Sequence, residues 1–144
     1  MKAFHLLLRI TLGGAMLYAG ALKALNPAAF AASLANYQLF PAFLLAPLAT
    51  LLPWLELVVG AALLTRRFPA GAAAWCTVLG AGFVTALGTA WLRGINLDCG
   101  CFGTSAAAGE GSLALALARA GLILAAAATL LRLEMKVGSG PGPR

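Results

Sequence analysis

The chain has 144 residues, of which 62% are hydrophobic and 10% are charged, and its formal net charge is +6. This composition excludes a soluble domain with a polar surface and indicates a membrane protein in contact with the lipid bilayer. Because the basic residues are scattered rather than gathered on one face, the positive charge does not indicate a nucleic-acid partner.

Four apolar stretches are each long enough to cross a membrane as an α helix, which takes about 20 residues. We expect these helices near residues 3–25, 42–65, 70–92 and 112–133. The first stretch also has features of a signal peptide, but its apolar run is longer than such peptides usually have. The sequence therefore predicts an all-α integral membrane four-helix bundle over residues 1–136 and a disordered tail over 137–144.

The segment between the first two long helices carries the signals of a shorter one. Asn26 is a candidate N-cap, and Pro27 suits the first helical position. Phe30, Leu34 and Tyr37 then follow at i, i+4 and i+7, which predicts one apolar face. We expect a short interfacial helix that covers the outer end of the bundle, the alternative being an unstructured connector.

The second apolar stretch contains a carboxylate. Glu56 lies about 14 Å from the inner end of this helix, where a charge is costly unless it is paired, protonated or hydrated. Arg9 and Arg119 are the candidate partners, each displaced by one or two turns, and Pro47 and Pro53 predict a kink just before the carboxylate. Either the pair is structural, or Glu56 carries a proton or contacts a cofactor within the bundle.

The segment LDCGCFG, residues 97–103, places two cysteines one glycine apart. The Cα atoms of Cys99 and Cys101 lie about 7 Å apart in an extended chain, whereas a disulfide needs about 5.5 to 6 Å. Gly100 permits the tight turn that would close the bond. A disulfide so strained is easily exchanged. Because the loop that it closes is so short, it also removes little entropy from the unfolded chain and would stabilise the fold very little. The spacing therefore favours a redox pair over a structural bridge.

Metal binding is the alternative reading of the two cysteines. Zinc usually takes four ligands, but His5 and Cys76 both lie towards the inner side and cannot reach the pair. A soft ion that accepts two thiolates, such as Cu(I) or Hg(II), remains an alternative, as does an inert pair.

The distribution of basic residues predicts the orientation of the chain. With four crossings, the N-terminus, the turn between the second and third long helices and the C-terminal tail lie on the same side of the membrane. Most basic residues lie in these segments, so this side should be cytoplasmic. The residues are Lys2, Arg66, Arg67, Arg132, Lys136 and Arg144. We therefore expect both termini in the cytoplasm, the bundle in the cell inner membrane and the cysteine pair outside, where disulfides persist. Lys23 should lie at the depth of the pair, where it either favours the thiolate or extends its ammonium group to the interface.

Three stretches of the sequence together resemble the methylamine-utilisation protein MauE family, within the wider group of DoxX-like four-helix membrane proteins. These stretches are RITLGGAMLYAGALKALNPAAFAASLANYQLFP, PWLELVVG and LDCGCFG. The resemblance implies a role in maturing periplasmic enzymes that carry disulfides, beside thioredoxin-like partners. It assigns thiol–disulfide chemistry to Cys99 and Cys101 within a motif that includes Gly100 and Phe102. It also marks matching polar positions at Arg9, Lys23, Glu56 and Arg119.

These observations lead to one functional hypothesis and two rivals. In the first, a thioredoxin-like partner forms a mixed disulfide with one cysteine of the pair and the other cysteine resolves it. Two electrons then enter or leave through another carrier, for which a lipid-soluble quinone near Glu56 is the candidate. The rivals are a membrane protein that binds or transports copper or mercury, and a non-catalytic scaffold for enzyme maturation.

Overall fold

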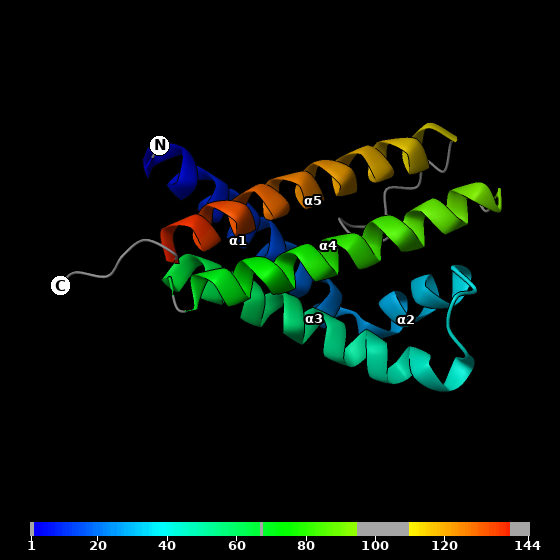
Figure 1. Cartoon of the computed structure of the whole chain (residues 1–144). Coiled ribbons are helices and arrows are strands. Elements are labelled where there is room, and N and C mark those ends of the chain that lie inside the picture. Colours follow the sequence, from blue (N-terminus) through cyan, green and yellow to red (C-terminus); the bar gives the residue numbers. More distant parts are fainter. Residues whose placement is uncertain (1, 67, 95–109, 139–144) are drawn as a thin grey trace.

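The computed structural model describes residues 2–66, 68–94 and 110–138, and within these ranges it contains only helices. The helices are α1 (Lys2–Leu25), α2 (Pro27–Asn36), α3 (Ala42–Thr65), α4 (Pro69–Leu92) and α5 (Glu110–Gly138) (Figure 1). All but α2 contain a stretch long and apolar enough to cross a membrane. The predicted all-α fold with four membrane-spanning helices is thus confirmed.

The last helix is longer than its apolar stretch suggested. It runs from Glu110 to Gly138, whereas we expected a helix near 112–133. The residues after the apolar run include Glu134, Met135 and Lys136, which favour helix and continue it beyond the predicted end. Of the predicted disordered tail, residues 139–144 lie outside the described part of the chain.

The short helix α2 forms as its capping signals predict. The side-chain Oδ1 of Asn26 accepts a hydrogen bond from the backbone N–H of Ala29, at 3.2 Å, and a proline opens the first turn. Phe30, Leu34 and Tyr37 are all buried. The first two pack against the opening turns of α3 around Ala49. The short segment is therefore a packed helix rather than a loose connector.

Helix α3 remains helical through both of its prolines, Pro47 and Pro53. A proline lacks the backbone N–H that would bind the carbonyl four residues earlier, so each one removes a hydrogen bond from the helix. Pro53 is nevertheless fully buried within the bundle. A kink before Glu56 stays a prediction.

Helices α1 and α3 make the closest contact in the bundle, and glycines allow it. A Cβ added at Gly60 would lie 2.9 Å from the carbonyl oxygen of Gly13, and one added at Gly20 would lie 2.9 Å from that of Pro53. In lipid, where no hydrophobic force draws helices together, such small residues let two backbones approach closely. The main core lies beside this contact and includes Leu12, Met16, Val59, Leu63, Ala73, Cys76, Ala127 and Leu130.

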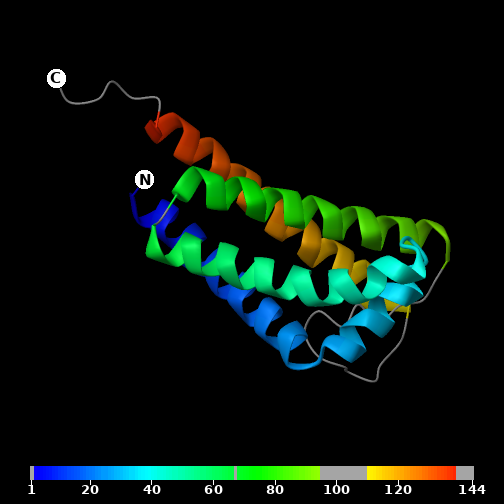
Figure 2. The same ribbon diagram turned by 90° about the horizontal axis from the view of Figure 1, so that it is seen from below.

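The helices alternate in direction, so each end of the bundle collects a defined set of helix ends. The start of α1, the end of α3, the start of α4 and the end of α5 lie together at one end (Figures 1 and 2). At the other end lie α2, the end of α4 and the start of α5. The segment that carries the cysteine pair joins α4 to α5, so both of its attachment points belong to the α2 end.

Candidate functional site

A buried ion pair joins the end of α1 to the middle of α3. The Nζ of Lys23 lies 2.5 Å from Oε1 of Glu56, and the two side chains are 2% and 1% exposed. Gly20, one turn before the lysine, makes the approach possible, because a Cβ there would lie 3.1 Å from the Cβ of Glu56. The pair therefore depends on the same close helix contact that holds α1 against α3.

Two aromatic rings complete the surroundings of the lysine. Its Nζ lies 4.2 Å from the ring centroid of Phe83 on α4 and 5.2 Å from that of Phe30 on α2. An ammonium group over an aromatic face is attracted to the ring, by up to about 2 kcal/mol where water is excluded. Side chains from α1, α2, α3 and α4 thus converge on one buried charge.

One atom of this cluster is left without a partner. Oε2 of Glu56 is buried and accepts no hydrogen bond from any residue that the structure describes. Leaving a buried polar atom unsatisfied costs about 1 to 3 kcal/mol, and more where the group is charged. Oε2 is therefore the polar atom of this cluster that has no hydrogen-bond partner among the described residues.

The partner of Glu56 is not one of the two arginines that the sequence suggested. Arg9 hydrogen-bonds elsewhere, and Arg119 is an exposed residue of α5. Nor does Lys23 extend to the membrane interface, since it is 3% exposed. Side chains of a helix slant towards its N-terminus, so the lysine stem at the end of α1 runs back into the bundle and meets the carboxylate there.

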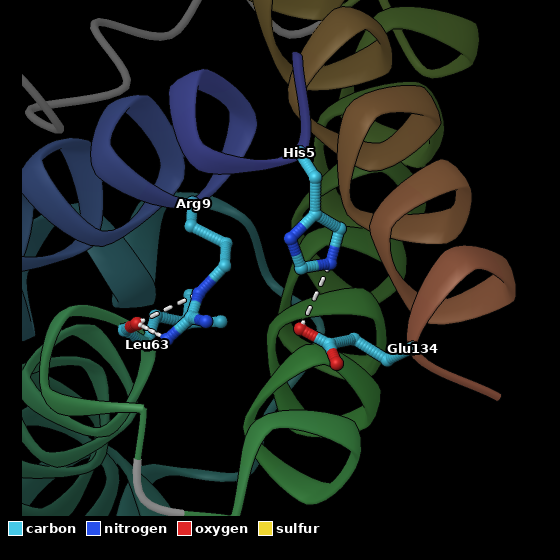
Figure 3. A network of polar contacts seen from close by, with 4 residues as sticks. All are labelled: His5, Arg9, Leu63 and Glu134. Carbon is cyan, nitrogen blue, oxygen red and sulfur yellow. Dashed lines mark hydrogen bonds and ion pairs between the residues drawn. The ribbon is translucent and has the colours of Figure 1, made fainter. Parts of the chain in front are cut away.

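A second polar cluster lies at the opposite end of the bundle (Figure 3). The guanidinium of Arg9 donates from Nε and Nη2 to the backbone carbonyl of Leu63, at 3.1 and 2.5 Å. This carbonyl belongs to the last turn of α3, where carbonyls lack partners within the helix, and a cation there also complements the helix dipole. Arg9 is therefore a cap for α3 and not a partner for Glu56.

The same end holds a contact that the sequence did not reveal. His5 Nε2 on α1 lies 3.0 Å from Glu134 Oε1 on α5, and the two side chains are 19% and 8% exposed (Figure 3). The even number of crossings places the start of α1 beside the end of α5, and this was the available signal. The apolar run ends near residue 133, so it did not mark Glu134 as part of this helix.

The predicted redox residues themselves cannot be placed. Cys99, Gly100, Cys101 and Phe102 lie outside the described residues. Cys76 is described: it is fully buried in the core on α4, and it is not in a disulfide. Within the described ranges, no three histidine, cysteine or acidic side chains lie close enough together to hold a metal ion.

Comparison with known proteins identifies one family. The sequence model described as "Methylamine utilisation protein MauE" matches residues 1–133. The chain is also similar to the methylamine utilization protein MauE of Methylophilus methylotrophus, with 44% identity over 73 residues. That alignment covers 50% of this chain and 38% of that protein, so the matched region spans well under half of the relative's length. No solved structure matches the chain.

Proposed function

The chain belongs to the methylamine utilisation protein MauE family, and from this membership we propose that it works in a thiol–disulfide exchange pathway outside the cytoplasm. The observation that carries the proposal is the Cys-Gly-Cys sequence in the segment that joins two membrane-spanning helices. A disulfide across one residue would be strained and readily exchanged. The pathway would mature periplasmic enzymes that carry disulfides, including those of methylamine utilisation.

The exchange involves a thioredoxin-like partner and a lipid-soluble quinone. A thiolate of one protein attacks the disulfide of the other, a mixed disulfide forms, and the second thiol of the attacking protein releases it. One dithiol is oxidised and the other disulfide is reduced, with two electrons and two protons transferred. A quinone held near Glu56 would supply a carrier for the same two electrons and two protons, by which Cys99 and Cys101 would be restored.

The other polar residues support this role from within the bundle. Glu56 is the proposed polar contact for the quinone, and Lys23 holds that carboxylate in place through the buried ion pair. Arg9 supports α3 through its cap on the last turn. Arg119, exposed on α5, lies in the half of that helix nearer the cysteine segment and adds positive charge there.

The proposed orientation rests on charge. Arg66, Arg132 and Lys136 lie at the end of the bundle that holds the start of α1, which favours a cytoplasmic position for that end. The α2 end, with both attachment points of the cysteine segment, then faces the periplasm across the inner membrane. Disulfides form and persist in that compartment.

A redox titration of the cysteine pair tests the proposal. The protein, with Cys76 replaced by Ala, is equilibrated in nanodiscs with glutathione or dithiothreitol buffers while metals are chelated, and free thiols are then labelled. We expect a reversible two-electron transition between about −120 and −270 mV, the range of exchange proteins. Thiols that stay reduced at every potential would overturn the proposal, and titration with Cu(I) and Hg(II) would then test the metal alternative.

A further inference from the structure

Helix α5 presents one exposed face along its length, and this face ends in two cations. Along its apolar stretch, α5 is the least buried of the four membrane-spanning helices. Six of its exposed residues recur at intervals of three and four, so they lie on one face of the helix. These residues, which we call the α5 stripe, are Ala118, Leu122, Ala125, Thr129, Arg132 and Lys136.

The α5 stripe is apolar up to its two cations. The hydroxyl of Thr129 donates a hydrogen bond to the backbone carbonyl of Ala125, at 2.8 Å, so it is satisfied within the helix. Leu122 is 72% exposed. From Leu122 to Arg132 the helix rises about 15 Å, which is about half of the 30 Å thickness of the hydrocarbon core. An acyl chain of one leaflet can therefore lie along the stripe.

The basic end of the stripe carries an excess of positive charge. Arg132 and Lys136 are four residues apart and both exposed, and like charges at this spacing repel each other. Arg66, at the end of α3, is a further exposed cation at the same end of the bundle. Among the described side chains at this end, the only acidic one is Glu134, which is 8% exposed and lies against His5. An anion from outside the described chain would balance the exposed cations.

We propose that the last turns of α5 bind the headgroup of an anionic phospholipid, with Arg132 and Lys136 on its phosphate and one acyl chain along the α5 stripe. A guanidinium can hold two phosphate oxygens at once, and the lysine ammonium adds a point charge one turn away. The membrane-spanning stretch of α5 ends at Lys136, so both long side chains reach the depth of the headgroups.

The two cations also select the kind of phospholipid. A zwitterionic headgroup carries its own cation beside the phosphate, and Arg132 and Lys136 repel that cation. A headgroup with a net negative charge meets no such repulsion, so the surface prefers it. This binding requires neither the cysteine pair nor a redox partner.

The affinity of the full chain for two phospholipids tests the proposal. Native mass spectrometry of the protein in detergent micelles measures the dissociation constants of phosphatidylglycerol and phosphatidylcholine with the same acyl chains. Each basic side chain near a membrane surface contributes about a fivefold gain in affinity for anionic lipid, so we expect phosphatidylglycerol to bind about thirtyfold tighter. Added salt should weaken its binding, because ions screen exposed charges. Equal affinities for the two lipids would overturn the proposal.

Four variants locate the site. Arg132→Gln and Lys136→Gln should each lower the affinity for phosphatidylglycerol about fivefold, and the double variant about thirtyfold. Arg119→Gln removes an exposed cation from the other half of the same helix and should retain the affinity. All three side chains are exposed, so the fold should persist, and circular dichroism checks this. A double variant that bound phosphatidylglycerol as tightly as the unchanged protein, or an equal loss in Arg119→Gln, would contradict the proposed site.

Glycerol phosphate distinguishes a lipid site from a site for free phosphate. It carries the phosphate without acyl chains, so it should not displace phosphatidylglycerol at comparable concentration. Displacement at comparable concentration would show that the apolar part of the α5 stripe takes no part in binding. The proposal of a phospholipid site would then be wrong.

Discussion

Replacing Lys23 with Met should destabilise the protein strongly, because it leaves a buried carboxylate without its counter-ion. At 2.5 Å the two charges attract by roughly 7 kcal/mol at an effective dielectric constant of about 20. Much of that attraction is offset by the cost of burying both groups, so the measurable loss is smaller. Removal of one partner of a buried pair typically costs about 3 to 5 kcal/mol.

The matched variant removes both charges. With Lys23→Met and Glu56→Leu together, no ion is stranded, and apolar side chains occupy the space, so we expect stability within about 2 kcal/mol of the unchanged protein. Arg119→Met removes an exposed cation from α5 and should change stability by less than about 0.5 kcal/mol.

The assay is reversible unfolding in mixed micelles with a rising fraction of SDS, followed by far-ultraviolet circular dichroism. With the single variant Glu56→Leu added, the free energies of unfolding of the two single variants, the double variant and the unchanged protein close a double-mutant cycle, which isolates the coupling between the two side chains. If the stability lost in the double variant equalled the sum of the losses in the two single variants, the pair would have no coupling energy and the reasoning would be wrong.

Three further predictions concern the helix contact, the α3 cap and the third cysteine. Gly20→Ala should cost about 1 to 3 kcal/mol in the same unfolding assay, because its Cβ would meet the backbone of Pro53; Gly14→Ala, which meets nothing within 4 Å, is the control and should not destabilise. Arg9→Met should cost about 1 to 3 kcal/mol, since it strands a carbonyl in the last turn of α3, and an unchanged unfolding curve would argue against the cap. Cys76→Ala should leave the redox midpoint of the Cys-Gly-Cys pair unchanged, because this thiol is fully buried in the core; a shift in that midpoint would show that the third cysteine takes part.

The parts of the fold that follow from local sequence were predictable. Apolar runs of sufficient length mark the spanning helices, and the Asn26-Pro27 start with its spaced apolar residues marks α2. Both signals depend only on neighbouring residues. The all-α membrane bundle could therefore be predicted without knowing which helices contact one another.

The partner of Glu56 was not predictable in this way, because it depends on how two helices are offset. Depths counted from helix ends assume that all helices start and stop at the same level. In the structure, Gly13 faces Gly60 and Gly20 faces Pro53, so α1 ends well before the start of α3 is reached. Helix α2 packs against the remaining turns of α3, and Lys23 lies deeper than its position near a helix end suggested.

The glycine contact and the ion pair share one register between α1 and α3, and this limits how the bundle can move. One residue of helix rotation is about 100°, so a slip of α1 by a single position would turn the lysine away from its carboxylate and drive side chains into the facing backbone. We therefore expect α1 and α3 to travel as one rigid body. We expect any conformational change that admits a ligand or a partner protein to move α2 or the α4–α5 pair, because these elements are not held by the α1–α3 contact.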